Sequence, residues 1–530
     1  MTSVPLQILS PSKLFADFVT GVDSIWNRFE HREVTDVLIE QRSKHGASRK
    51  RLVALVEQGM RSVELSILQK QSLKALGERA VVVATGQQIG LLGGPLYTLL
   101  KVASAAQLAS ELAEQYAHTV VPVFWLEDND HDAKEASTAV FSLDGVLQTS
   151  TVWNGSEERL PVSRRTYSAD EVERIKTLLP SLKGPFESDV QRLLEGVYVE
   201  GAAWNDAFVR LLQPFLAAWG VLVVRGSDVI ASGLHAPILE RDLASPGMLS
   251  SLVREASASL ETLGYHVQAT PTHAMFFRHD EAGGRQRIQP DENFLELAHA
   301  QPALFSPNAL ARPIVQDAVL PTIAAVLGPA EIAYHAQLRE AYAACGVPMP
   351  VPYNRHSATL LDAKTTRNLV KEGLQAVDMM RAWQSVESET VSMLGEDSVP
   401  SPEFSASAVD AVFAGYASAA ESIDKTLSAA VEAGKASTRN TLEAIRGKLR
   451  SALRRKNIEQ LERRRTMHKL IFPLDVYQER IYPVAYMTGQ FGTDGLRIIV
   501  EHIVKRPRIQ HVIIGPEDIT SSQEDITSAQ

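Results

Sequence analysis

The stretch that decides the fold is residues 80–109, which read AVVVATGQQIGLLGGPLYTLLKVASAAQLA. It opens with a short apolar run rich in valine, typical of a buried strand, and closes with a long helical pattern. Gly94 and Pro95 stand at the start of that helix, where proline is tolerated. Another buried strand is predicted in HTVVPVFWLED, directly after the helix. Continuous apolar strands joined by helices predict an α/β fold with a parallel sheet covered on both faces.

Ligands of such sheets bind beyond the carboxyl ends of the strands. The segments ATGQQ and EDNDHD each follow a predicted strand, so both are expected at that edge. A further strand is predicted within WGVLVVRGSD, residues 219–228. The segments at about 145–215 and 240–310 are mixed in composition and are interpreted as insertions. Residues 1–78 read as helical, with one helix over 12–29 and a second over 49–76.

The character of the chain changes at about residue 365, where glycine and proline become sparse. Apolar residues then recur at near-heptad spacing, which predicts two long helices joined by the break GEDSVPSPEFS at 395–405. We therefore predict two domains: a core over 1–364 with its insertions, and an antiparallel coiled-coil hairpin with a closing segment over 365–530. The last residues, EDITSSQEDITSAQ, are polar and are expected to fray.

Composition excludes several classes of protein. The chain has 530 residues, of which 45% are hydrophobic and 22% charged, with a net charge of −10. We therefore expect no nucleic-acid partner, although the stretch 446–465 is basic and is most simply the solvated face of a helix. We expect no membrane segment, because no apolar run approaches the ~20 residues of a span. The single cysteine, Cys345, excludes internal disulfides, and the N-terminus lacks a secretory signal, so a cytoplasmic location is predicted.

The first turn, residues 85–94, offers two kinds of polar group to a ligand. Backbone N–H groups at a helix start attract an anion such as a phosphate, and glycine allows it to approach closely. Glutamine side chains both donate and accept hydrogen bonds. The alternative is a glycine-rich connection that only packs a strand against a helix. We predict nucleotide binding by Gly86, Gly94 and Pro95, and substrate binding by Thr85, Gln87, Gln88, Tyr97 and Lys101.

The second turn carries a histidine between two aspartates, Asp130-His131-Asp132. Two carboxylates beside an imidazole can hold the imidazolium and raise the pKa of the histidine. This arrangement suits a general base or a ligand for an ammonium group, so we predict a catalytic role for all three residues. A solvated acidic loop is the simpler alternative. A metal site is less favoured, because carboxylates and one histidine in consecutive positions cannot all face one ion, and no metal ligand is predicted.

A third cluster lies in ARPIVQDAVLP and GPAEIAYHAQLRE, residues 311–321 and 328–340. Arginines can bind carboxylates through forked hydrogen bonds, although any single arginine is more often structural. We expect Lys101, Arg312 and Arg355 to form a carboxylate-binding set at the sheet edge. The residues predicted to bind substrate in this region are Arg312, Gln316, Asp317, Glu331, Tyr334 and Arg355.

Four segments in order resemble the bacillithiol-biosynthesis cysteine-adding enzymes, which are cysteine ligases: residues 85–102, 121–132, 306–350 and 470–480. The order and spacing hold along nearly the whole chain. The resemblance implies a Rossmann-like core, similar to class I aminoacyl-tRNA synthetases and nucleotidylyltransferases, with connecting-peptide-like insertions and a C-terminal coiled coil that forms a homodimer. The family motif reads Glu-Asp-His-Asp where this chain has Asn129-Asp130-His131-Asp132, so a role that needs a carboxylate at Asn129 is not carried over.

The reaction implied by the resemblance joins the carboxyl group of L-cysteine to the amine of glucosaminyl-malate and yields bacillithiol. A free carboxylate is a poor acyl donor, so we expect activation by a nucleotide, ATP or ADP being the cofactor expected at the first turn. The first turn then holds either a nucleotide phosphate or a substrate carboxylate, and the sequence leaves both open. Two alternatives are a nucleotidylyltransferase-like enzyme acting on another amino acid or acid, and a non-catalytic coiled-coil scaffold.

Overall fold

The structure, a computed structural model, describes residues 2–9, 12–44, 47–143, 145–155, 160–182, 184–281, 283–290, 292–393, 399–515 and 518. The chain divides into a core unit of residues 1–143, 147–363 and 478–530, and a hairpin unit of residues 144–146 and 364–477. Residues 478–530 thus belong to the core unit, although we predicted one domain over 365–530. The reason is strand pairing, because β13 (Gln510–Ile514) lies between β1 (Thr2–Pro5) and β12 (Ser357–Leu360). Apart from Asp518, the predicted frayed end at 517–530 lies outside the described residues.

The centre of the core unit is a five-stranded parallel sheet with the order β11-β10-β2-β3-β6. From β2 the chain adds β3 and β6 on one side, and later adds β10 and β11 on the other. The carboxyl ends of β2 and its neighbours therefore face a topological switch point, where ligands of such sheets bind. The predicted parallel sheet is confirmed, with strands β2 (Val81–Gln88), β3 (Val120–Glu127), β6 (Leu222–Arg225), β10 (Thr322–Leu327) and β11 (Val351–Asn354).

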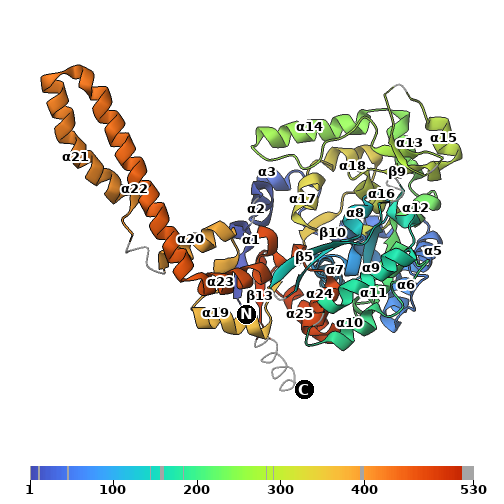
Figure 1. Cartoon of the computed structure of the whole chain (residues 1–530). Helices are drawn as coiled ribbons and strands as arrows, with labels where there is room; N and C mark the ends of the chain where they lie inside the picture. Colours follow the sequence, from blue (N-terminus) through green and yellow to red (C-terminus); the bar gives the residue numbers. More distant parts are fainter. Residues whose placement is uncertain are drawn as a thin grey trace. The chain divides into compact units, whose positions relative to one another are not determined.

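Both faces of the sheet are buried, and Figure 1 shows helices on its two sides. Side chains alternate along β2: Val81 and Val83 join one apolar cluster, whereas Val82 and Ala84 join the larger core. The helix that follows β2, α7 (Tyr97–Tyr116), contacts both β2 and β3. This two-sided burial explains why the strand reads as an uninterrupted apolar run rather than as an alternating one.

The N-terminal region differs from the two long helices expected there. The first is broken at Gly21, whose φ of +80° is left-handed, into α2 (Lys13–Val19) and α3 (Asp23–Trp26). The second is broken before Ser66, because that side chain accepts a hydrogen bond from the Gln69 amide in a capping box and so starts a new helix. The other elements here are α1 (Leu6–Leu9), α4 (Asp36–Ser43), α5 (Arg49–Gly59) and α6 (Ile67–Gly77), and β1 was not expected.

Apart from residues 145–146, the segments predicted as insertions lie within the core unit. The ring of Phe208 in α11 stacks on that of Phe124 in β3 with centroids 6.4 Å apart, so α11 is part of the core packing. Between β3 and β6 run α8 (Ala133–Ala136), β4 (Thr138–Leu143), β5 (Val146–Thr151), α9 (Ala169–Leu178), α10 (Glu187–Leu194) and α11 (Trp204–Ala218). Between β6 and β10 run α12 (Gly226–Ala231), α13 (Ala236–Ala244), α14 (Met248–Thr262), β7 (Phe276–His279), β8 (Arg285–Arg287), α15 (Leu295–Ala300), β9 (Phe305–Pro307) and α16 (Ala311–Val319). The remaining helices are α17 (Pro329–His335), α18 (Arg339–Cys345), α24 (Val484–Phe491) and α25 (Thr493–Val504).

The hairpin unit is helical, but its turn lies elsewhere than predicted. The two long helices meet at residues 424–427, where Asp424 accepts hydrogen bonds from the amide and the hydroxyl of Thr426 and so stabilises a tight turn. Of the break predicted at 395–405, residues 394–398 are outside the described part of the chain, and Ser401 caps the next helix. The helices are α19 (Ala363–Glu372), α20 (Trp383–Met393), α21 (Pro402–Ile423), α22 (Ser428–Lys456) and α23 (Ile458–Ile471).

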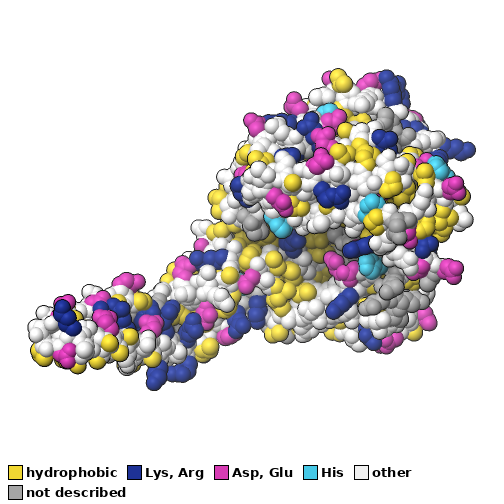
Figure 2. Space-filling view, turned by 90° about the horizontal axis from the view of Figure 1, so that it is seen from above, with side chains coloured by type: hydrophobic (Ala, Val, Ile, Leu, Met, Phe, Trp, Pro, Cys, Tyr) yellow, Lys and Arg dark blue, Asp and Glu magenta, His cyan; other side chains and the backbone are white. Residues whose placement is uncertain are grey.

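The near-heptad apolar positions of the hairpin are not all covered by its two helices. Val409 is buried, whereas the side chains of Val412 and Ile423 are 62% and 79% exposed. Figure 2 shows hydrophobic side chains scattered among charged ones along the hairpin. Within the described residues, no helix is long and apolar enough to cross a membrane.

The contact between α5 and β6 gives a test of the core packing. A Cβ atom at Gly59 would lie 2.7 Å from the backbone oxygen of Val223, and a backbone atom cannot move aside as a side-chain end can. We expect Gly59→Ala to lower the free energy of unfolding by about 1–3 kcal/mol, the usual cost of overpacking. Gly495→Ala in α25 is the control, because nothing lies within 4 Å of its Cβ position. Thermal melts in which the two variants match the wild type would contradict this packing.

Candidate active site

A cavity of about 340 Å³ opens at the carboxyl edge of the parallel sheet. Its walls come from the ends of β2, β3, β10 and β11 and from the starts of α16 and α17, as the switch point predicts. The predicted site residues that line it are Gly86, Gln87, Gln88, Tyr97, Lys101, Asp130, Arg312, Glu331, Tyr334 and Arg355.

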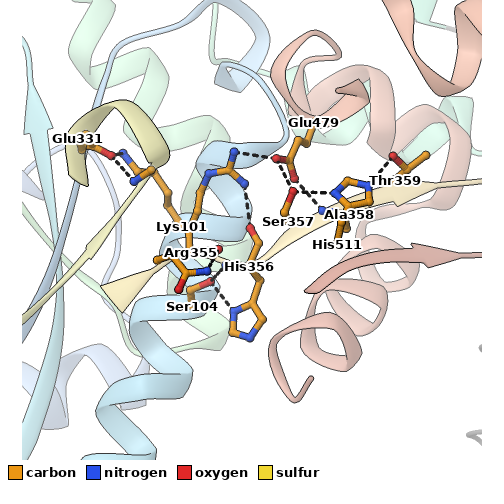
Figure 3. Close-up of polar contacts among 12 residues, drawn as sticks. Lys101, Ser104, Glu331, Arg355, His356, Ser357, Ala358, Thr359, Glu479 and His511 are labelled. Carbon is orange, nitrogen blue, oxygen red and sulfur yellow. Dashed lines mark hydrogen bonds and ion pairs between the residues drawn. The ribbon is translucent and has the colours of Figure 1, made fainter. Parts of the chain in front are cut away.

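Lys101 and Glu331 form a buried ion pair in the cavity wall, with Nζ and Oε2 2.6 Å apart (Figure 3). The ammonium also donates to Gln87 Oε1 at 3.2 Å and to the carbonyl of Gly86. Burial lowers the pKa of Lys101, partly offset by Glu331. Burial by itself would raise the pKa of Glu331, but the charge of Lys101 outweighs it and holds that pKa below its ordinary value. We therefore assign an ionised pair whose charges cancel.

Arg312 approaches the cavity from α16 with neutral hydrogen-bond partners. Its Nη2 donates to the Tyr334 hydroxyl at 2.8 Å, and its Nη1 to Gln316 Oε1 at 3.3 Å. A Cβ atom at Gly86 would lie 3.3 Å from Nη1, so glycine at this position makes room for the guanidinium. Burial raises the pKa of Tyr334 to about 12. The phenol is therefore neutral at pH 7 and does not cancel the charge of Arg312.

Glu127, at the end of β3, is an acid of the cavity wall. Its Oε2 accepts a hydrogen bond from Trp125 Nε1 and its Oε1 from the amide of Asn129, each at 3.2 Å. Burial raises the pKa of Glu127, and the positive charge of Arg312 opposes that shift. In the cavity wall, the positive charge of Arg312 thus favours the ionised form of Glu127.

Arg355, which follows β11, is neutralised by a second buried acid. Its Nη2 lies 2.7 Å from Glu479 Oε1, and its Nη1 donates to the carbonyl of His356 at 2.8 Å. Figure 3 shows Glu479 accepting two further hydrogen bonds, from the Ser357 hydroxyl at 2.8 Å and the Ala358 amide at 2.7 Å. The guanidinium carbon also lies 5.3 Å from the centroid of the Tyr97 ring.

A second cavity of about 510 Å³ adjoins the first, and the two share Gln87, Gln88, Tyr97 and Arg480 in their walls. Gly94 and Pro95 line this second cavity. At the predicted anion site at the start of α7, three amides already have partners: Gly94 N–H donates to Leu91, Leu96 N–H to Tyr482 and Thr98 N–H to Pro95. Gly94 itself has a φ of +67°, which explains glycine there by backbone conformation.

The predicted catalytic triplet is only partly brought together. His131 Nδ1 lies 3.2 Å from Asp130 Oδ1, which leaves Nε2 on the open side of the ring. Asp132 instead caps α8, its Oδ1 accepting a hydrogen bond from the Glu135 amide at 2.9 Å, so the expectation that two aspartates hold the imidazole is corrected to one. Asp130 lines the first cavity and also accepts a hydrogen bond from Gln88 at 2.6 Å. The side chain of His131 is 57% exposed and lies outside that lining.

Three predicted substrate-binding residues lie outside the wall of either cavity. Thr85 is buried, and its hydroxyl donates to the carbonyl of Val326 on the neighbouring strand β10 at 2.8 Å, so it is used within the sheet. Asp317 is buried and accepts a hydrogen bond from the Tyr342 hydroxyl at 2.6 Å. Gln316 contacts Arg312 and Asp317, so it positions the arginine rather than lining the cavity.

Four polar residues of the cavity were missed by sequence reasoning: Glu127, Arg285, Asn308 and Arg480. Glu127 carried a signal, since it ends a predicted strand. Arg285 lies in β8, far along the chain, and reaches the cavity by donating to the Pro307 carbonyl at 2.9 Å. No local pattern marks Arg480. Within the described residues, no group of three or more His, Cys, Asp or Glu side chains could hold a metal ion.

The comparisons agree with this geometry. Residues 1–356 match the family model described as "Bacillithiol biosynthesis BshC, N-terminal Rossmann-like domain", and residues 358–514 match the corresponding C-terminal coiled-coil domain. The core is thus a Rossmann-like domain with a polar cavity at its switch point, the class of protein that binds small molecules at this edge. The chain belongs to the BshC family of bacillithiol biosynthesis.

Three relatives illustrate the breadth of the match, each named "Putative cysteine ligase BshC". The protein from Salinibacter ruber is 30% identical over 82% of this chain and 83% of its own length. The protein from Chloroherpeton thalassium is 30% identical over 83% of both chains. The protein from Geobacillus thermodenitrificans is 27% identical over 93% of this chain and 95% of its own.

The pair of Arg355 and Glu479 gives a test of the electrostatics. Burial would raise the pKa of Glu479, but Arg355 and the surrounding donors outweigh it and hold the pKa below its ordinary value of 4.5. The carboxylate therefore stabilises the fold fully above pH 4.5, and this contribution is lost as the pH falls through the lowered value. Glu479→Gln should cost about 3–5 kcal/mol at pH 7, because it leaves the arginine unpaired.

Denaturant unfolding between neutral and acid pH measures this effect. The difference between the wild type and Glu479→Gln should shrink below pH 4.5. Glu296→Gln, on an exposed side chain, is the control and should match the wild type throughout. A constant difference across the acid range would show that the ionised form of Glu479 does not stabilise the fold.

Proposed function

We propose that the protein is a cysteine ligase that joins the carboxyl group of L-cysteine to the amine of glucosaminyl-malate, forming an amide. Two facts support this proposal: the family to which the chain belongs, and a charged cavity at the switch point of its sheet. The observation that supports it most is a cavity in which Arg312, hydrogen-bonded to the neutral phenol of Tyr334, lies with the hydrogen-bonding side chains of Gln87 and Gln88. Such groups suit polar substrates that bear carboxylates.

We propose different roles for the cations of the first cavity. Lys101 and Arg355 were predicted to bind carboxylates together with Arg312, but each is cancelled by a buried acid at 2.6–2.7 Å. We therefore propose that the substrate binds to Arg312 and to Arg285, whose ion pair with Asp130 is longer, at 3.7 Å. Lys101 and Arg355 instead hold the walls in place.

A proton must leave the amine when it attacks the acyl carbon, and His131 is the base that we propose. With Nδ1 beside Asp130, a neutral ring presents the lone pair of Nε2 to the proton. The carboxyl group of cysteine also needs activation, for which ATP remains our prediction. It is tested by following nucleotide consumption in a mixture of cysteine and glucosaminyl-malate.

We expect His131→Ala to lower the rate of amide formation by about 10²–10⁴-fold, the usual contribution of a general base. The exposed position of the side chain means that the fold should be unaffected, so the melting temperature serves as the control. Mass spectrometry of the thiol product measures the rate. Asp132→Asn, which changes the α8 cap, should lose much less activity. Wild-type turnover by folded His131→Ala would remove this residue from the mechanism.

We also propose that the exposed apolar side chains of the hairpin form a homodimer interface. Val412, Tyr416 and Ile423 on α21, with Ile445 and Leu449 on α22, are each at least 45% exposed. Apolar side chains at near-heptad positions are typical of contacts between helices. Light scattering should show a dimer for the full chain, and a monomer when Val412, Tyr416 and Ile445 are all changed to Ser. A monomeric wild-type chain at micromolar concentration would contradict the interface.

A further inference from the structure

Within the described part of the chain, Arg480 is the one arginine in the walls of both cavities. It is exposed and lines both of them. Among the described residues, no hydrogen bond or ion pair engages its guanidinium, which lies over the Tyr97 ring at 5.9 Å from the centroid. Lys101 and Arg355, by contrast, are each paired with a buried acid. An unpaired guanidinium on an aromatic ring keeps both its charge and its forked set of donors for a ligand.

The backbone around Arg480 is held firmly. The preceding residue, Glu479, accepts hydrogen bonds from Ser357 and Ala358, and Gln478 bonds to both the amide and the carbonyl of Leu360. Because the two preceding side chains are buried and hydrogen-bonded, the backbone from which Arg480 extends is fixed before any ligand arrives. Preorganised groups of this kind lose little entropy on binding.

Tyr97 forms part of the wall between the two cavities. The guanidinium carbons of Arg355 and Arg480 lie over its ring, 5.3 Å and 5.9 Å from the centroid, and its hydroxyl accepts a hydrogen bond from Gln87 Nε2 at 3.0 Å. Because the two cavities adjoin and share residues of their walls, a single ligand of sufficient length could occupy both. The second cavity, at about 510 Å³, is the larger of the two.

The other charged groups of the second cavity limit what it can hold. Lys134, Asp132 and Glu135 also line it. Burial, with the charges of Asp132 and Asp130, raises the pKa of Glu135. The α8 wall thus carries two carboxylates and one ammonium group, whereas the opposite wall carries Arg480. A substrate carboxylate is therefore favoured at Arg480, and hydroxyl groups suit the mixed α8 side.

We propose that the second cavity binds the hydroxylated, carboxylate-bearing part of the amine substrate, with Arg480 as the carboxylate-binding residue that determines specificity. The amine end of the substrate then crosses beside Tyr97 into the first cavity. This inference rests on the proposed ligase function and adds to it a subsite and a residue for substrate selection.

A comparison of two amines tests the inference on the full-length protein. One is glucosaminyl-malate, and the other is methyl glucosaminide, which has the amine and the sugar hydroxyls but no carboxylate. We expect Arg480→Gln to lower kcat/KM for glucosaminyl-malate about 10- to 100-fold more than for methyl glucosaminide, as expected for loss of a charge-assisted hydrogen bond. Arg480→Lys, which keeps the charge without the fork, should lie between. Equal losses for both amines would overturn the inference.

A binding measurement separates this inference from the ligase function. L-malate is the probe, titrated calorimetrically into the wild type, Arg480→Gln and the control Arg174→Gln, which removes an exposed arginine of α9 outside both cavities. We expect malate to bind the wild type and the control alike, and Arg480→Gln at least 10-fold more weakly. Unchanged affinity in Arg480→Gln, or no measurable binding to the wild type, would overturn the subsite. If malate binding follows Arg480 but neither amine is ligated to cysteine, the ligase function fails and the carboxylate subsite stands.

Discussion

The buried ion pair between Arg355 and Glu479 is the interaction on which the site depends. Taking both charges out of water costs several kcal/mol per ion, so the pair is stable only because further donors complete it. Ser357 and Ala358 supply those donors to the carboxylate, and the carbonyl of His356 accepts from the arginine. The pair therefore fixes the segment that follows the helical hairpin to the end of β11, and it places Arg480 beside Tyr97.

The cavity walls separate charges that hold the structure from charges that remain for a ligand. The sequence gives no reason to distinguish Lys101 and Arg355 from Arg312 as carboxylate-binding residues. In the structure, however, Lys101 and Arg355 each form an ion pair with an acid within 2.7 Å. Arg312 has only a neutral phenol and an amide as hydrogen-bond partners. In a cavity of low dielectric, an uncancelled charge attracts an anion far more strongly than a paired one. The ability to bind a carboxylated substrate thus lies with a minority of the basic residues near the cavity.

Much of the fold could be predicted because its signals are local. The apolar runs of β2, β3 and β6 are buried on both faces, which gives each a clear strand pattern. The predictions that were wrong have two causes: a partner distant in sequence and a weak local signal. Strand β1 reads as part of a helical region, and it is a strand only because β13, at the other end of the chain, pairs with it. The turn of the hairpin was misplaced because the short Asp424–Thr426 contact is a weaker signal than a proline-rich break.

The sequence by itself determined the parallel sheet and the identity of most polar residues at its carboxyl edge, because strand direction and strand ends follow from local pattern. It also pointed to the BshC family through four ordered segments. Only the tertiary structure decided what those residues do. Asp132 caps a helix, and Thr85 forms a hydrogen bond within the sheet. Arg480 lines the first cavity although it follows the helical hairpin in the sequence. The physical reason is that the effective charge and the accessibility of a side chain depend on partners that folding brings from distant parts of the chain.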